Sequence, residues 1–419
     1  MKKTLTITLI VLSVVVLLLL AWFWLFPGSS SPVADKIRDG LPFGSGDDVN
    51  IPTADNQQPT TDDTTDPTGA PTIRLFQITR DPVAGAIAFN PSTSSGQALR
   101  QGSGQASTTI RYVDRATGHI YDVNPVTLEK TKVTNRTLPK IYEAYFRDDG
   151  NAVLFRSLTD DGDTVKSFTL TLTPPRTIST TSPENNLHSI ETVDLRGDMD
   201  SIVVGSGNNL FYTLTSTGSI VSSTFSGENL KTIYSSAFTS WRLSLSGNNL
   251  FVYPKASASM TGYTYTLRTT GGNLSRVLGP LNGLVVTPNR VGGFAYSYIN
   301  NGVMNFTVRE TLNSEELVLP GTLAEKCVWS EAREWVLYCA MPIGKIEAGE
   351  PDNWYRGITH FSDRIWYFNT RVNISEVLAD PDKVVGVSLD IYKPSLSPNE
   401  DYLIFINKND LSLWALKLD

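Results

Sequence analysis

The segment SLSPNEDYLIFINKNDLSLWALK, residues 395–417, shows the sequence pattern from which the fold is predicted. A polar turn, SPNED, precedes the apolar run YLIFI, and a second apolar run, LWAL, follows after a short polar break. Short runs of aliphatic and aromatic residues bounded by turn residues are typical of β-strands. The segment therefore predicts a turn followed by two successive strands.

The same pattern recurs along the chain. Six segments have a strand, a polar turn and an apolar second strand: AYFRDDGNAVLFRSL (144–158), VDLRGDMDSIVVGSG (193–207), RLSLSGNNLFVYPKA (242–256), VVTPNRVGGFAYSYI (285–299), CVWSEAREWVLYCAM (327–341) and PSLSPNEDYLIFINK (394–408). Their second strands begin near residues 153, 202, 250, 294, 336 and 403. Most of these intervals match the roughly 40–50 residue period of four-stranded propeller blades.

The region before residue 144 adds a seventh unit. Its four predicted strands are VAGAIAFN (83–90), TTIRYVDR (108–115), GHIYDVNP (118–125) and LEKTKVTN (128–135). The last unit of the chain has only three strands, and IRLFQIT (73–79) is unassigned. We expect IRLFQIT to supply the missing outer strand, because ring closure covers exposed sheet edges. The sequence therefore predicts an all-β, seven-bladed β-propeller over residues 73–419.

The repeat resembles that of TolB-type and WD40-like bacterial propellers, in which a proline–acidic turn precedes an apolar strand. SPNE (397–400) and RDDG (147–150) are the turns that come nearest, while the usual Trp-Ser-Pro-Asp-Gly turn is not intact. The resemblance covers about residues 73–419 and extends to uncharacterised membrane-anchored propellers. It implies a binding or scaffolding platform and supplies no catalytic residues.

The N-terminal 72 residues differ from the repeats. Thr4–Phe26 is uncharged and long enough to cross a bilayer as a helix. Lys2 and Lys3 precede it, so the positive-inside rule predicts a cytoplasmic N-terminus and an extracytoplasmic propeller at the plasma membrane. A cleaved signal peptide is the alternative. Residues 27–72 are rich in Pro, Asp and Thr and carry a charge of −6, which predicts a disordered linker.

Charge and motif content limit the function. With about −3 left after residue 72, the predicted propeller has no basic footprint for nucleic acid. No G-x-S-x-G motif is present, and His119, His188 and His360 fall in separate units. Acidic turns such as TDDGDT (159–164) and RGDMDS (196–201) lack the full EF-hand pattern. We therefore expect no metal, no cofactor and no catalytic constellation.

Two insertions interrupt the repeat. Residues 91–107, PSTSSGQALRQGSGQAS, have little to pack and are expected to be a tolerated loop between two strands. Residues 342–363 separate the second and third strands of the sixth unit. They carry candidate partner-binding residues, whose mixture of aromatic and polar groups is typical of recognition hot spots: Asp352, Asn353, Trp354, Tyr355, Arg356 and His360. The alternative is a lid whose Trp354 and Tyr355 pack onto neighbouring units.

The two cysteines, Cys327 and Cys339, are equidistant from the centre of a predicted hairpin. An antiparallel hairpin would bring them opposite one another, where either a disulfide or two buried thiols are possible.

These observations favour a membrane-tethered, non-catalytic module that binds an envelope protein or a cell-surface glycan. Two rivals stay open. A glycan-cleaving or lyase-type enzyme requires carboxylates, or a histidine with a carboxylate, converging at one mouth of the central channel. A structural spacer requires two featureless faces.

Overall fold

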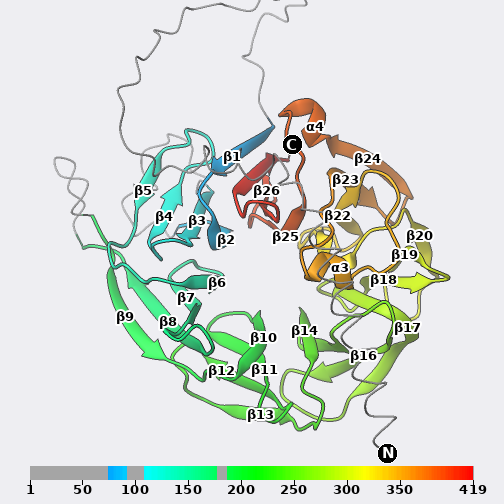
Figure 1. Cartoon of the computed structure of the whole chain (residues 1–419), viewed down its shortest axis with the longest axis horizontal. Helices are drawn as coiled ribbons and strands as arrows, with labels where there is room; N and C mark the ends of the chain where they lie inside the picture. The colour runs from blue at the N-terminus through cyan, green and yellow to red at the C-terminus, as the bar shows by residue number, and fades with distance from the viewer. Residues whose placement is uncertain (1–73, 92–107, 177–185, 419) are drawn as a thin grey trace, which may run out of the picture. The chain divides into compact units, whose positions relative to one another are not determined.

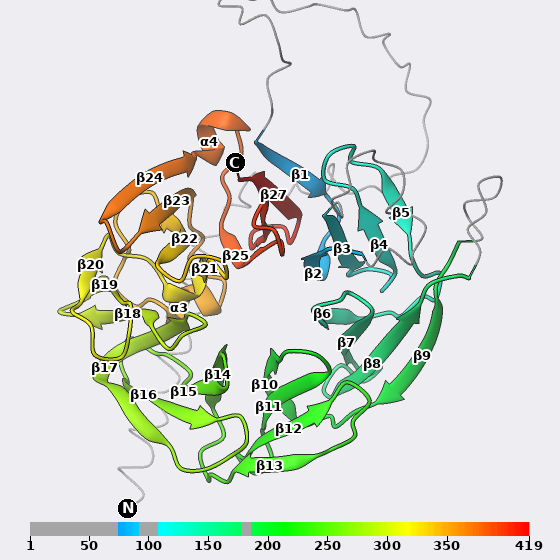
Figure 2. The ribbon, with the colours of Figure 1, turned by 180° about the vertical axis from the view of Figure 1, so that it is seen from behind.

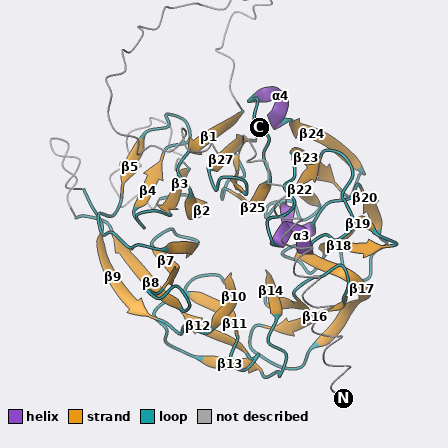
Figure 3. Cartoon of the chain, in the orientation of Figure 1, coloured by secondary structure: helices purple, strands orange, loops and turns teal. Residues whose placement is uncertain are grey.

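The computed structural model describes residues 74–91, 108–176 and 186–418. They belong to one compact unit, Ala70–Asp419, which is all-β apart from short helical turns (Figure 3). No helix among the described residues is both long and apolar enough to span a bilayer. The predicted span Thr4–Phe26, the linker 27–72 and residues 92–107 of the first insertion lie outside the described residues.

The described strands form six sheets. The first three are four-stranded, and their strands are hydrogen-bonded in the order of the chain. The first sheet has β2 (Val83–Phe89), β3 (Thr109–Asp114), β4 (Ile120–Val123) and β5 (Lys130–Lys132). The second sheet has β6 (Ile141–Phe146), β7 (Ala152–Leu158), β8 (Val165–Thr173) and β9 (Ser189–Asp194). The third sheet has β10 (Met199–Val204), β11 (Asn209–Leu214), β12 (Ile220–Thr224) and β13 (Lys231–Tyr234).

The next sheet is seven-stranded: β14 (Trp241–Ser246), β15 (Asn249–Pro254), β16 (Thr261–Arg268), β17 (Ser275–Pro288), β18 (Phe294–Asn300), β19 (Val303–Arg309) and β20 (Leu317–Leu319). Its long central strand β17 pairs with β16 through its first half and with β18 through its second half. Gly279, at φ +104°, lies within β17, and a Cβ there would meet the backbone of Gly262 at 2.6 Å. Only glycine accommodates this close turn of the strand.

The last two sheets are again four-stranded: β21 (Cys327–Trp329), preceded by the 3-10 turn η3 (Ala324–Lys326), with β22 (Val336–Pro342), β23 (Asp363–Asn369) and β24 (Ile374–Ala379); then β25 (Ile391–Leu396), β26 (Tyr402–Asn407), β27 (Leu413–Lys417) and β1 (Leu75–Thr79). The helical turns α3 (Asp352–Tyr355) and α4 (Pro381–Val384) lie in the loops of this region.

The sheets follow one another around a ring, with β2, β6, β10, β14 and β25 innermost (Figures 1 and 2). Hydrophobic clusters lie between neighbouring sheets, such as the cluster shared by β2–β4 and β6–β8. Second strands are covered on both faces, and all six residues of β26 are buried. This double burial explains why the second strands read as continuous apolar runs rather than as alternating patterns. The described residues thus form a propeller fold.

One segment differs from the sequence prediction. VDLRGDMDSIVVGSG (193–207) was expected to contain the first and second strands of one unit. Instead, its VD residues end β9, the outer strand of one sheet, and MDSIVV forms β10, the innermost strand of the next. β9 pairs with β8 and β10 pairs with β11, so these two strands do not form a hairpin. A turn between blades and a turn within a blade have the same strand–turn–strand pattern, which is why the sequence misled.

The first and last strands of the unit pair with each other. β1 is antiparallel to β27, with Leu75 opposite Leu416 and Gln77 opposite Trp414. β1 thereby becomes the outer strand of the sheet that begins with β25. This pairing joins the two ends of the ring.

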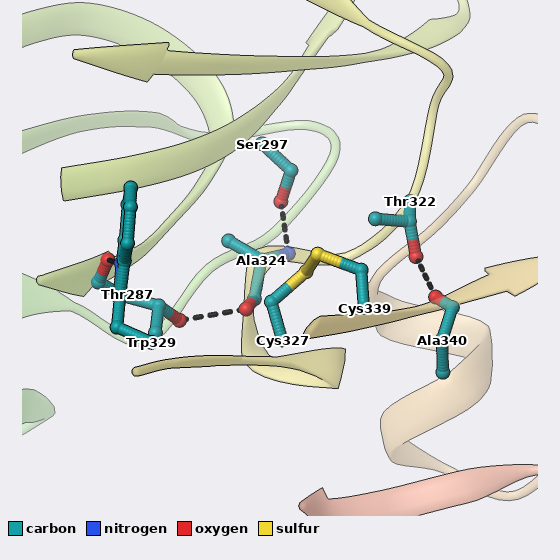
Figure 4. Close-up of a disulfide and its surroundings, with 8 residues drawn as sticks. All are labelled: Thr287, Ser297, Thr322, Ala324, Cys327, Trp329, Cys339 and Ala340. Carbon is teal, nitrogen blue, oxygen red and sulfur yellow. Dashed lines mark hydrogen bonds between the residues drawn. A yellow bond between two sulfur atoms is a disulfide. The ribbon is translucent and has the colours of Figure 1, made fainter. Parts of the chain in front are cut away.

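Cys327 and Cys339 lie directly opposite one another on β21 and β22 and form a disulfide (Figure 4). Both are buried, at 4% and 1% exposure. The chain beside the disulfide is fixed by Ser297 Oγ, which accepts a hydrogen bond from Ala324 N, and by Thr287 Oγ1, which donates to Ala324 O. The hairpin is thus closed by the disulfide, and the turn that precedes it is held by the two hydrogen bonds of Ala324.

We expect the double substitution Cys327→Ala/Cys339→Ala to lower the free energy of unfolding by roughly 3 kcal/mol, because a crosslink over a short loop restricts the unfolded chain. Urea unfolding with and without reductant measures this. Reductant should destabilise the natural chain and leave the double variant unchanged. Equal sensitivity of both proteins to reductant would contradict the assignment of the effect to this disulfide.

Candidate binding site

The insert between β22 and β23 bridges its own sheet to both neighbouring sheets. Asp352 Oδ2 accepts a hydrogen bond of 2.7 Å from Ala258 N in the β15–β16 loop. Tyr355 OH donates to Glu325 Oε1 at 2.6 Å in η3, ahead of β21. On the other side, Trp354 reaches the residues that precede β25. The insert is therefore anchored to the propeller at several points.

Trp354 lies inside the protein, with 1% of its surface exposed. Its Nε1 donates to both carboxylate oxygens of Asp390 at 3.0 Å. Its backbone N–H donates to Glu350 Oε2, and its carbonyl accepts from Lys408 Nζ. An indole N–H satisfied in this way is typical of a core tryptophan. Trp354 is thus not available to a partner.

The remaining candidates of the insert lie at its surface. Arg356 and His360 are exposed, and Asn353 is half-buried. Arg356 Nη2 donates to Asn353 Oδ1 at 2.6 Å. Asp352, Trp354 and Tyr355 therefore bond to residues outside the insert, whereas Arg356 and His360 are exposed and Asn353 bonds to Arg356. Trp354 and Tyr355, the two aromatic residues among the six candidates, thus contact the protein itself.

A buried ionic cluster supports the insert. Lys326 Nζ lies 2.7 Å from Asp363 Oδ2 and 2.5 Å from Asp390 Oδ1, and all three side chains are 0% exposed. The rings of Trp354 and Phe361 lie 5.0 and 4.8 Å from the same ammonium. Two carboxylates thus share one cation in an apolar setting, where charges persist only when they are paired.

Burial raises the pKa of Asp363 from 3.8 to about 6, against the opposing effect of the Lys326 ammonium. The folded chain therefore holds this proton more tightly than the unfolded chain does. The contribution to stability is fully present below about pH 4 and is lost as pH rises through about 6.

We expect Asp363→Asn to remove this dependence. The difference in the free energy of unfolding between the natural chain and the variant should change by on the order of 1 kcal/mol per pH unit between about pH 4 and 6. Urea titrations at several pH values measure it. Two parallel stability curves over that interval would contradict the raised pKa of Asp363.

Three acidic side chains of the turns 159–164 and 196–201 have basic partners. Asp160 Oδ1 lies 3.2 Å from Lys140 Nζ, and Asp198 is held by Arg196 at 2.9 Å. Asp200 Oδ2 lies 2.6 Å from Arg242 Nη1. Across the described part of the chain, no group of three or more His, Cys, Asp or Glu residues is placed to hold a metal ion.

A histidine also lies near a carboxylate, but that carboxylate is already bound. Burial and the nearby Arg111 guanidinium lower the pKa of His188 to about 4, so His188 is neutral at neutral pH. Arg111 Nε and Nη2 contact both oxygens of Asp122 at 2.6 and 2.7 Å. Arg111 Nη1 donates to Gly150 O in the next sheet. We interpret this group as a buried contact between two sheets.

Residues of the inner strands β2, β6 and β25 line a cavity of about 370 Å³. These three strands lie toward the middle of the ring (Figure 1). The cavity lining includes small residues, because β2 contributes Gly85 and Ala86 and β6 contributes Ala144. A Cβ on Gly85 would meet Ala144 O at 2.1 Å, so the two strands approach too closely for any larger residue. Its volume falls in the usual range of ligand sites.

Lys393 lines this cavity at an irregular point of β25. Tyr392 pairs with Ile406 and Ser395 with Ile404, so two residues of β25, Lys393 and Pro394, oppose the single residue between them on β26. This is a β-bulge. Lys393 has φ +50°, which is unfavourable for a lysine and more so before proline. Such backbone conformations cluster at functional sites, where surrounding packing maintains them.

The charge of Lys393 is only loosely balanced. Its Nζ lies 3.7 Å from Glu143 Oε1, whereas Glu143 Oε2 lies 2.8 Å from Arg156 Nη1. The rings of Tyr145 and Tyr392 lie 5.0 and 5.2 Å from Nζ. Burial lowers the pKa of Lys393, but its neighbours reverse this and the net shift is upward, so the side chain is a cation at neutral pH. With the side chain 33% exposed, an incoming anion can reach it.

Sequence reasoning missed this cavity. Two signals were present: the small-residue strand VAGAIAF, and the Lys-Pro pair within the strand IYKPSL. Proline inside a strand marks an edge or a bulge. The contact between these two strands, at opposite ends of the folded unit, could not be read from either segment.

The sequence matches no family model and no curated protein sequence. Among solved structures, the chain is similar to an oligogalacturonate lyase from Vibrio parahaemolyticus, with 10% identity, 83% of this chain and 94% of that chain covered, and a TM-score of 0.48. It is similar to a virginiamycin B lyase from Staphylococcus aureus, with 12% identity, 80% of this chain and 99% of that chain covered, and a TM-score of 0.44. It is also similar to the β-propeller domain of the Trilobed protease from Pyrococcus furiosus (7%, 74% and 90%, TM-score 0.47). Similarities this low assign no ligand or reaction to this chain.

Proposed function

We propose that this chain is a membrane-anchored β-propeller that binds a partner outside the membrane without catalysing a reaction. Residues Thr4–Phe26 form the single anchor, the N-terminus is cytoplasmic, and residues 27–72 tether the propeller. The uncharged run after Lys2 and Lys3 supports this orientation. The Cys327–Cys339 disulfide supports an oxidising compartment.

The propeller has seven blades in this proposal, of the TolB-type and WD40-like kind. The seven-stranded sheet counts as two blades that share β17, because its halves pair with different neighbours. Each half then completes a four-stranded unit, matching the other five sheets.

Recognition takes place at the cavity beside Lys393. The observation that carries this is the β-bulge that places a loosely paired cation among the residues lining a largely apolar cavity. Preorganised charge next to apolar walls favours binding of a complementary group. The insert 342–363 acts as a packed lid on the ring, since Trp354 and Tyr355 bond within the protein.

Capture from native membranes tests this proposal with the full chain. Lys393→Met removes the charge in the cavity, and Arg356→Ala/His360→Ala alters the exposed part of the insert. We expect the natural chain and the insert variant Arg356→Ala/His360→Ala to capture a partner. Lys393→Met should fail to capture it.

Two other outcomes would contradict the proposed recognition at the Lys393 cavity. Loss of the partner with the insert variant alone would place recognition on the insert. Capture of nothing by any of the three proteins would overturn the binding proposal and favour an enzyme or a spacer. Urea unfolding of each variant separates loss of binding from loss of folding.

A further inference from the structure

We infer that the Lys393 cavity takes a carboxylate carried on a compact apolar body, such as a free branched-chain acid or the C-terminal residue of a polypeptide. This inference rests on the proposed function and names the chemistry of the ligand. It follows from the walls of the cavity, its charge and its rigidity.

The walls favour an apolar body over a sugar. Residues from six strands line the cavity, and most of them are aliphatic or aromatic, among them Phe146, Val204, Ile404, Phe405 and Leu413. Tyr145, Lys393 and Ser395 are the lining side chains that carry a polar group. A sugar presents hydroxyl groups on every side, and each one buried without a partner costs free energy. A branched or aromatic group has no such requirement.

The charge favours an anion with few hydrogen-bond requirements. Arg156 already binds Glu143 at 2.8 Å, while Lys393 lies 3.7 Å from the same carboxylate. The cations of Arg156 and Lys393 therefore face the single carboxylate of Glu143. The ammonium of Lys393 can still donate N–H groups to a ligand. A carboxylate at hydrogen-bond distance from Nζ would complete this pairing through a charge-assisted bond.

The rigidity of the bulge favours selective binding. Pro394 fixes its own φ, and Ser395 resumes the regular register of β25 after the bulge. The aromatic rings of Tyr145 and Tyr392 lie beside the ammonium. Lys393 is thus held before the ligand arrives, so less side-chain freedom is lost on binding.

Location restricts how a ligand can enter. β6 contributes its last three residues to the cavity and β10 its last residue, Val204. These positions lead into the turns between first and second strands, at the opposite ends of the strands from the insert. A cavity lined by strands of several sheets admits a small molecule or a chain end more readily than the middle of a folded surface.

Calorimetric titration of the full chain in detergent tests the inference. The probes are 4-methylpentanoate and its neutral amide, and N-acetyl-Ala-Leu as free acid and as C-terminal amide. We expect each acid to bind at least tenfold more tightly than its amide. Binding of the peptide acid tenfold above the free acid identifies a chain end as the source, and the reverse order identifies a free acid.

Variants give a second, independent measurement. Lys393→Met should weaken binding of the acids at least tenfold, whereas Lys383→Met, the same substitution at an exposed lysine of α4, should not change it. If Lys393→Met does not fold, the acid–amide comparison on the natural chain still decides.

Three results would overturn the inference: equal binding of acid and amide, undiminished binding by a folded Lys393→Met variant, or tighter binding of glucuronate than of 4-methylpentanoate. If no probe binds while a membrane partner is still lost with Lys393→Met, the ligand class is wrong and the binding function stands. If no partner is captured either, both proposals fail.

Discussion

Lys326→Met is expected to lower the free energy of unfolding by about 3–5 kcal/mol, the usual cost of breaking a buried ion pair from one side. The substitution leaves Asp363 and Asp390 facing each other without a cation, and both side chains are 0% exposed. Asp390 also holds Trp354 Nε1, so the insert should loosen with the cluster. Urea unfolding at pH 7 measures the loss of stability.

Lys383→Met is the matched control for this effect. Its side chain is 74% exposed and lies 3.3 Å from Asp380, so its removal should cost less than about 1 kcal/mol. Equal stability of Lys326→Met and the natural chain would mean that the carboxylates of the cluster are protonated when the lysine is absent. The cluster would then not depend on its cation.

Trp354→Ala is expected to cost about 3–5 kcal/mol, as for other large-to-small substitutions in protein cores. The indole fills the space between the insert and β25 and lies over the ammonium groups of Lys326 and Lys408. Hydrogen exchange should show that the substitution speeds amide exchange more across the insert than across β7 or β26. Thermal unfolding gives the overall loss of stability.

Arg356→Ala tests the specificity of this result, because Arg356 lies two residues away and is exposed. We expect a change within about 0.5 kcal/mol. If Trp354→Ala were as stable as Arg356→Ala but no longer captured a membrane partner, Trp354 would serve recognition. The packed-lid assignment would then be wrong.

Much of the fold is predictable because it depends on local pattern. Apolar runs bounded by polar turns identify β2, β3, β15, β18, β22 and β26 closely. The pairing of β1 with β27 follows from counting strands, since the last unit has three and one strand precedes the first unit. The assignment failed at residues 193–207, where the local pattern is the same whether a turn joins two strands of one blade or two different blades.

The candidate site was less predictable, because burial depends on residues distant in sequence. Nothing near Trp354 indicates that Asp390 and Lys408 will bond to it. A composition typical of a recognition surface is also typical of a packed lid, and only the neighbours decide between them. The Lys393 cavity depends on small residues of β2 that lie beside β25 only after the ring closes.

The pairing of β1 with β27 has a consequence for how the chain reaches this structure. The two strands come from opposite ends of the unit, so their contact has nearly the greatest sequence separation the unit allows. Contacts of this kind slow folding, because the ends of a long chain must meet before the contact forms. During synthesis β1 emerges early and must wait until the ribosome has released β27. In that interval β1 lacks its partner strand and has unpaired edges open to other chains, which makes the nascent protein prone to aggregate until the ring closes.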